Sequence, residues 1–254
     1  PMLFRHPAFF ALVAVVLTGA VISPAAEPTK PARFLAVSAT AGFRHGSIER
    51  AEVVLEELGR STGLYHLDYL RMPSGNKDDP AWQENLAAQF TKAFDPAVLA
   101  DFDGVMFVST TGELPVPDLT GFLAWIKSGK AFVGFHAASD TFKSSDAYTE
   151  MIGGHFAGHP WGAGGEHGFV VHEPDHPVTA MFSPRFRFRD EIYQYDSRYV
   201  PENLRVLVSL DMAASQPQEP WYVPVSWVRN YGQGRVFYTN FGHNDATWND
   251  PAFQ

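Results

Sequence analysis

Histidines beside glycines follow three of the apolar runs in this chain. His45 lies in AGFRHGS after RFLAVSAT, His136 follows AFVGF, and His243 lies in NFGHND after RVFYT. Each run has the length and composition of a buried strand. Ligand crevices of open α/β sheets lie beyond the carboxyl ends of the strands, so we expect the three imidazoles to share one site. For any one of the ten histidines, a role in a turn is the plainer interpretation.

Three imidazoles that meet in one crevice allow two kinds of chemistry. A neutral imidazole with its ordinary pKa of ~6.5 can remove a proton at neutral pH and return it. Alternatively, three histidines and a water make an open zinc site, with His45, His136 and His243 as the candidate ligands. Spacing alone does not choose between the two.

A second histidine group lies in MIGGHFAGHPWGAGGEHG. His155 and His159 have the spacing of metal ligands on a helix, but the Glu of an H-E-x-x-H motif is missing. Gly158 and Pro160 would also end a helix here. The pattern predicts a Gly-rich loop over the crevice, with His159 pointing into it.

The segment RDEIYQY supplies two carboxylates, Asp190 and Glu191. Neighbouring residues on a strand face opposite sides, so at most one of the two points into the site. That carboxylate would orient an imidazole or act as an acid or base. The alternative is a solvated strand edge, with Arg187 and Arg189 as partners.

Other residues near these positions are candidate substrate contacts. Arg44 precedes the first histidine and Asp245 follows the third. The indole rings of Trp161, Trp221 and Trp248 have the shape to stack on a sugar.

Composition excludes several other functions. The chain has no cysteine, which rules out a thiol nucleophile, a disulfide and zinc–thiolate ligands. A G-x-S-x-G elbow, a P-loop and a G-x-G-x-x-G after a strand are all missing. The formal charge is −9, and no Lys/Arg cluster is present. We therefore expect neither a nucleic-acid partner nor binding to an anionic membrane surface.

The elements that position these residues follow from hydrophobic periodicity. Strands and helices alternate in the first half, which predicts a mainly parallel sheet covered on both faces. The expected strands there are 33–40, 64–70, 102–110 and 131–135, and the expected helices are 47–60, 82–93 and 118–129. Ser47 can cap the first helix. In the second half the patterns predict strands at 167–174, 186–195, 204–210 and 223–241, the last with a hairpin turn near YGQG.

The N-terminal segment 2–26 has the layout of a secretory signal, with cleavage after Ala25 or Ala26. Its apolar run is shorter than a membrane span, although an uncleaved anchor stays open. We expect a periplasmic or secreted bacterial protein that leaves the membrane once the signal is cleaved. The rest, 33–254, reads as one domain. It stops at NDPAFQ with no closing helix, from which we expect a truncated chain.

The chain contains, in this order, the motifs TAGFRHGSI, GKAFVGFHAASD, YTEMIGGHFAGHPW, DHPVTA, DEIYQY and VSWVRNYGQGRVFYTNFGHNDATWNDPAF. Together these motifs resemble the ThuA-like (trehalose utilisation) family over 33–254. The resemblance implies a class I glutamine amidotransferase-like fold, which is a flavodoxin-like three-layer α/β sandwich.

The resemblance also implies which residues line the pocket: His45, His136, His159, Glu191 and His243. His136 occupies the strand-to-turn junction where amidotransferases of this fold carry a catalytic Cys. Glutaminase activity is therefore not expected. The family is linked to bacterial use of trehalose and related disaccharides, including routes through 3-keto sugars, so the expected partner is a small carbohydrate.

We consider three functions. In the first, an enzyme acts on a disaccharide or 3-keto sugar by acid/base chemistry: His136 removes a proton beside the ketone, Glu191 orients it or acts as the acid, and His45 or Arg44 stabilises the enolate oxygen. The substrate contacts would be His159, Trp161, Asp245 and Trp248, and His243 would share the catalytic group. The second is a metal-dependent sugar hydrolase with a divalent ion such as zinc on the three histidines. The third is a non-catalytic carbohydrate-binding module.

Overall fold

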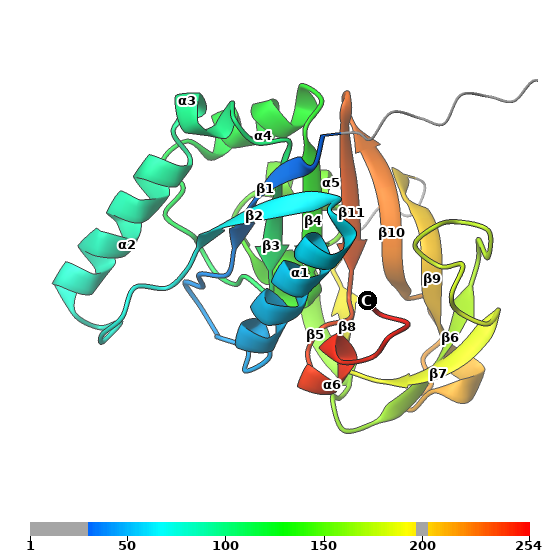
Figure 1. The fold of residues 1–254 in the computed structure, drawn as a ribbon. Coiled ribbons are helices and arrows are strands. Elements are labelled where there is room, and N and C mark those ends of the chain that lie inside the picture. Colours follow the sequence, from blue (N-terminus) through cyan, green and yellow to red (C-terminus); the bar gives the residue numbers. More distant parts are fainter. Residues whose placement is uncertain (1–29, 197–202) are drawn as a thin grey trace, which may run out of the picture. The chain divides into compact units, whose positions relative to one another are not determined.

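A mixed nine-stranded sheet runs through the unit that spans Pro31–Gln254 (Figure 1). The structure, a computed structural model, describes residues 30–196 and 203–254. The strand order is β2-β1-β3-β4-β11-β10-β9-β6-β7. The predicted signal segment 2–26 lies outside the described residues.

One half of this sheet is parallel. Its strands are β2 (Tyr65–Leu70), β1 (Ala32–Val37), β3 (Gly104–Val108), β4 (Ala131–Phe135) and β11 (Gly234–Thr239). Every residue of β3 is buried, as expected for an apolar strand in a sheet covered on both faces. Because the strands run the same way, their carboxyl ends meet at one edge of the sheet.

The other half is antiparallel, so "mainly parallel" describes only the first half. It begins with the hairpin between β10 (Pro224–Tyr231) and β11, and continues through β9 (Arg205–Asp211), β6 (Glu166–Val171) and β7 (Arg185–Arg189). Gly232 makes the turn of the hairpin with a left-handed φ of 63°. The tight turn reverses the chain and leaves no room for a crossover helix.

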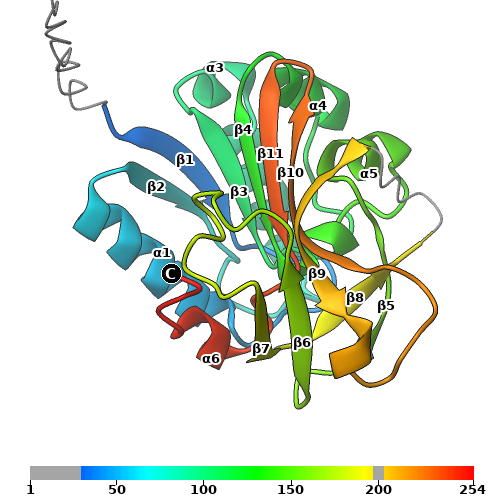
Figure 2. The same ribbon diagram turned by 90° about the vertical axis from the view of Figure 1, so that its right-hand side faces the viewer.

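Helices cover both faces of the parallel half (Figure 2). α1 (Ile48–Thr62) and α6 (Asp245–Trp248) share an apolar core with one face. α2 (Pro80–Ala93), α4 (Leu119–Lys127) and α5 (Asp146–Ile152) share a core with the other, and the short α3 (Pro96–Leu99) follows α2. The expected three-layer α/β sandwich is confirmed.

A separate two-stranded sheet pairs β5 (Phe156–Trp161) with β8 (Ile192–Tyr195). Two sequence predictions are wrong here. The Gly-rich segment is a strand rather than a loop, because it finds a partner in β8. The single strand expected at 186–195 breaks after Arg189, because β7 pairs with β6 and β8 pairs in the other sheet. Asp190 and Glu191 form the junction between the two.

No helix within the described residues is both long and apolar enough to cross a membrane.

Candidate functional site

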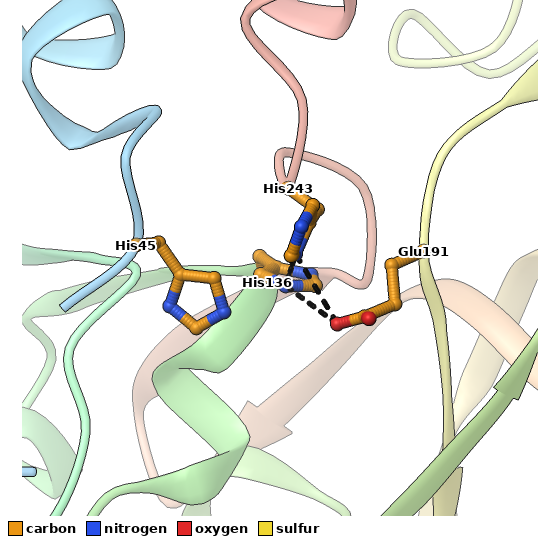
Figure 3. A group of neighbouring side chains, drawn as sticks. All are labelled: His45, His136, Glu191 and His243. Atoms are coloured by element: carbon orange, nitrogen blue, oxygen red, sulfur yellow. Dashed lines mark hydrogen bonds and ion pairs between the residues drawn. The ribbon is translucent and has the colours of Figure 1, made fainter. Parts of the chain in front are cut away.

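Four side chains from distant segments converge at the carboxyl edge of the parallel strands (Figure 3). His45 lies in the loop between β1 and α1, His136 directly follows β4, His243 follows β11, and Glu191 lies at the β7–β8 junction. Atoms able to bind a metal, one from each residue, all lie within 4.8 Å of one another. Figure 3 shows His45 and Glu191 on opposite sides of His136 and His243.

Three of these atoms form a compact triangle. His243 Nδ1 lies 3.2 Å from His136 Nε2 and 3.2 Å from Glu191 Oε2. The third edge, from His136 Nε2 to Glu191 Oε2, is 3.6 Å. The oxygen carries lone pairs, and so does any ring nitrogen that bears no hydrogen, so these atoms approach closely only around shared protons or a cation.

His136 directs a lone pair into this triangle. Its Nδ1 lies 2.7 Å from the backbone carbonyl oxygen of Asn240, which can only accept a hydrogen bond. The hydrogen of the neutral ring is therefore on Nδ1, and Nε2 has the free lone pair. The backbone of His136 also has a left-handed φ of 46°, which is unusual for a residue other than glycine. The sharp turn from β4 into the following 3-10 helix (His136–Asp140) aims the imidazole at the cluster.

His45 completes the group as a buried, neutral imidazole. Its ring stands edge-on to His136 and His243, with centroids 4.8 and 5.2 Å apart. Burial, reinforced by the two other histidines, lowers the pKa of His45 to about 3. The hydroxyl of Tyr193 lies 3.3 Å from His45 Nε2. At neutral pH the ring is uncharged, and the ring nitrogen that bears no hydrogen is available as a metal ligand.

Glu191 and His243 favour opposite charges. Burial disfavours the charged form of Glu191, but its interactions with His136 and His243 outweigh burial and hold the pKa of the carboxyl below its usual range. The interaction with Glu191 raises the pKa of His243 above its ordinary value, against the effect of burial. Glu191 therefore carries a negative charge beside the imidazoles, and that charge favours either a proton on His243 or a cation bound in the place of that proton.

Asp190 fixes the loop that carries His243. Its Oδ2 accepts a hydrogen bond from the backbone N–H of Gly242 at 2.7 Å, and its Oδ1 accepts one from Asn244 at 3.0 Å. The side chain is fully buried, so the solvated edge considered for it is wrong, and Arg187 pairs with Glu166 instead. Burial raises the pKa of Asp190. The two neighbouring carboxylates thus divide the work: one holds the loop and the other enters the cluster.

Asn240 is a structural residue that sequence reasoning missed. Besides accepting from His136, it accepts from the backbone N–H of Tyr193 through Oδ1 at 3.0 Å and donates to the Tyr193 carbonyl through Nδ2 at 3.2 Å. It therefore ties His136 to the segment beside Glu191. The signal for it was a polar amide at the end of an apolar strand.

Comparison with known proteins places the chain in a family. The family described as ThuA, trehalose utilisation, matches residues 33–254. The chain belongs to the ThuA family. A search of curated proteins gave no match.

Solved structures of two ThuA-like proteins and of a β-galactosidase are similar in fold to this chain. A ThuA-like protein from Bacteroides uniformis has a TM-score of 0.67 at 20% identity, over 91% of this chain and 90% of that one. A ThuA-like protein from Parabacteroides merdae has a TM-score of 0.61 at 18% identity, over 84% and 80%. A β-galactosidase from Bacillus circulans has a TM-score of 0.52 at 9% identity, over 87% of this chain but 30% of that one. At these identities the likeness concerns the fold alone.

In this ThuA chain, His159 lies at the rim of the cluster. Its Nδ1 is 3.4 Å from Glu191 Oε1, and its side chain is 57% exposed. The residue reaches Glu191 from strand β5 rather than from the expected loop, because β5 pairs with β8 beside the junction that holds Glu191. This imidazole contacts Glu191 and is also exposed, so a ligand can reach it.

Two other predicted substrate contacts of the ThuA chain lie near the starts of α1 and α6. Arg44 donates to the Ser38 carbonyl at 2.9 Å and pairs with Glu49 at 2.8 Å, so its guanidinium is held toward the start of α1. Asp245 is exposed as the first residue of α6. The ion pair with Glu49, in the first turn of α1, orients Arg44, and the start of α6 sets the position of Asp245.

The stacking role expected for two tryptophans is wrong. Trp161 is fully buried in an apolar cluster, and its indole N–H donates to the Pro217 carbonyl. Trp248 is buried against Phe135 and Phe253. A ring with both faces in the core cannot receive a sugar. Trp221 is partly exposed, away from the cluster, in a hollow lined by 194–196 and 221–224.

Proposed function

We propose that this ThuA-family chain is a metal-dependent enzyme acting on a carbohydrate, with the ion held by His136, His243 and Glu191. His45 supplies a fourth ligand or stays with the Tyr193 hydroxyl. The carbohydrate class rests on the family to which the chain belongs.

The triangle of ligand atoms carries this proposal. Tetrahedral zinc with bonds of ~2.0–2.2 Å separates its ligand atoms by roughly 3.3–3.6 Å. The observed separations are 3.2, 3.2 and 3.6 Å. At these separations His136, His243 and Glu191 would be able to hold one ion together.

The surroundings of the triangle support the same interpretation. Histidine ligands typically donate their other ring N–H to a carbonyl or carboxylate, which fixes the tautomer, and His136 does so to Asn240. Two imidazoles and one carboxylate suit zinc and also other first-row ions such as iron. With no cysteine in the chain, the site offers no thiolate ligand.

An ion in this position would act as a Lewis acid. It would polarise a sugar carbonyl or lower the pKa of a bound water, while the protein fixes the open coordination position. His159, exposed beside Glu191, is placed to exchange a proton with the substrate. The reaction would take place at the carboxyl edge of the parallel strands.

The test is a zinc titration of protein stripped with EDTA, followed by calorimetry and elemental analysis. We expect one ion per chain in the wild type and at least a tenfold loss of affinity in His136→Ala, His243→Ala and Glu191→Gln. His66→Ala, which changes an exposed histidine on β2, is the matched control and should bind as the wild type does. A wild-type chain that holds no stoichiometric zinc, iron or manganese would refute the metal centre.

The close pair of His243 and Glu191 favours a second candidate function. Without a metal, an imidazole with a raised pKa next to a carboxylate is an acid/base pair able to move a proton beside a sugar ketone. Incubation with 3-keto-trehalose, followed by NMR, separates the two. Activity that persists in EDTA and is lost in His243→Ala supports the metal-free pair.

We also propose that the chain is exported and acts on a small carbohydrate outside the cytoplasm. The motif at 2–26 supports export. N-terminal sequencing of protein recovered from the periplasm should begin at Ala26 or Glu27. Recovery from the cytoplasm with 2–26 intact would contradict export.

A further inference from the structure

One exposed aromatic ring lies beside the histidine cluster. Phe43 is 68% exposed, the largest fraction among the large apolar side chains in the described part of the chain. Its ring stands edge-on to His45, with the centroids 4.9 Å apart. Because His45 also contacts His136 and His243, Phe43 adjoins the cluster through His45. An isolated exposed Phe is ordinary on a protein surface, but its place beside these histidines calls for a reason.

The loop that carries Phe43 is held rigidly. The backbone N–H groups of Ala41 and Gly42 both donate to the Thr111 carbonyl, at 2.9 and 3.2 Å. Thr111 Oγ1 donates in turn to the Phe43 carbonyl at 2.6 Å. A Cβ on Gly112 would lie 2.7 Å from the Gly42 nitrogen, so the two loops touch backbone to backbone. The backbone that carries the ring is therefore fixed before a ligand arrives, which reduces the conformational entropy lost on binding.

A cleft of about 590 Å³ adjoins this loop. Its wall combines apolar side chains with two cationic groups and two carboxylates, and includes Phe43, Arg44, Lys77, Trp82, Glu84 and Glu113. A sugar ring has the complementary chemistry, with an apolar C–H face that stacks on an aromatic ring and hydroxyls that bind charged and polar groups.

We propose that Phe43 is the stacking platform for the non-reacting ring of a disaccharide, with Lys77 and Glu84 binding hydroxyls of that ring. The reacting ring would lie at the His136–His243–Glu191 cluster. The inference rests on the proposed function and adds a specificity-determining residue to it, because a monosaccharide would fill only one of the two positions. Phe43 would then set the preference for disaccharide over monosaccharide.

The test compares the binding of trehalose and glucose by calorimetry. We expect the wild type to bind trehalose at least tenfold more tightly than glucose. Phe43→Ala should lose about tenfold in trehalose affinity, with glucose affinity unchanged, and Phe43→Trp should retain the preference. The matched control is Leu64→Ala, which removes another exposed apolar side chain. Leu64 immediately precedes β2, at the amino ends of the parallel strands, whereas Phe43 lies at their carboxyl ends.

Two results would overturn the proposal: a wild type that binds trehalose no more tightly than glucose, or a Phe43→Ala variant that keeps the full preference. Each protein is measured both zinc-loaded and EDTA-stripped, with its metal content determined. A trehalose preference that depends on Phe43 in a chain without stoichiometric metal would refute the metal centre and leave the platform standing. A metal-loaded chain without the trehalose preference would support the metal centre and refute the role proposed for Phe43.

Discussion

At the scale of single residues, His136 is positioned by strain and anchoring together. A left-handed φ costs a residue other than glycine a conformational free energy of order 1–3 kcal/mol. Here it is offset by the hydrogen bond from Nδ1 to the Asn240 carbonyl and by the bond from the Tyr238 hydroxyl to the His136 carbonyl, each 2.7 Å long. Both constraints fix the direction of the imidazole before any ligand arrives.

Asp190 gives a prediction at the same scale. Asp190→Asn replaces one acceptor oxygen with an NH₂ group, which then faces the backbone N–H of Gly242 or of Asn244. We expect about 1–3 kcal/mol less unfolding free energy by urea titration. Calorimetry should also show a tenfold to hundredfold weaker zinc affinity, because the His243 loop is released, as is typical when the partner of a ligand is lost.

The control for this change is Asp250→Asn. Asp250 lies on the same C-terminal segment, and its Oδ1 accepts from Ala252 at 2.8 Å, a bond that asparagine can keep. Equal zinc affinity in Asp190→Asn and Asp250→Asn would show that the Asp190 carboxylate does not position the site.

Sequence reasoning reached the cluster because strand exits can be read from hydrophobic runs. His45, His136 and His243 each follow such a run, and motif resemblance added Glu191. The tryptophans could not be placed in the same way. Whether an indole faces a ligand or the core depends on tertiary packing, and β5 and its neighbours bury Trp161 completely.

At the scale of elements, the start of α1 and the His243 loop are joined. Ser47 occupies the N-cap position of α1, but its hydroxyl makes no capping bond and instead donates to the Gly242 carbonyl at 2.8 Å. The Trp248 indole donates to the same carbonyl at 3.0 Å. A residue predicted to serve its own helix therefore serves a loop far along the chain, which local sequence cannot reveal.

The β10–β11 hairpin gives the element-scale prediction. Gly232→Ala would place a Cβ 2.7 Å from the Lys127 carbonyl oxygen at a left-handed φ of 63°. We expect the variant to lose more than about 1 kcal/mol of unfolding free energy, seen as a lower urea midpoint. Gly162→Ala is the control, because a Cβ there meets nothing within 4 Å. Matching midpoints for the two variants would contradict this account of the turn.

At the scale of the whole molecule, the alternating half was predictable and the antiparallel half was only partly so. Strands that alternate with helices become parallel neighbours through right-handed crossovers. This rule accounts for the order β2-β1-β3-β4. Strand order in the second half depends on long-range pairing. The pairing of β6 with β9, and of β5 with β8 in a second sheet, has no local signal.

Metal binding should stabilise the whole fold. Zinc at about 100 times its dissociation constant adds roughly 2.7 kcal/mol if it binds only the folded chain. For a chain of this size that amounts to a rise in Tm of roughly 5–10 °C. Differential scanning calorimetry with and without zinc measures it. The double variant His136→Ala/His243→Ala should show no rise, and an equal rise in that variant would place the bound ion elsewhere.

The four cluster residues are drawn from almost the full span of the described chain, from residue 45 to residue 243. A growing polypeptide therefore has no complete cluster until residue 243 has emerged from the ribosome. If the cluster binds an ion as proposed, an ion held by all four side chains would be captured after the sheet has formed and would not guide its formation. The protein would thus acquire its ion in whichever compartment it completes folding, and the ion available there would decide which one it carries.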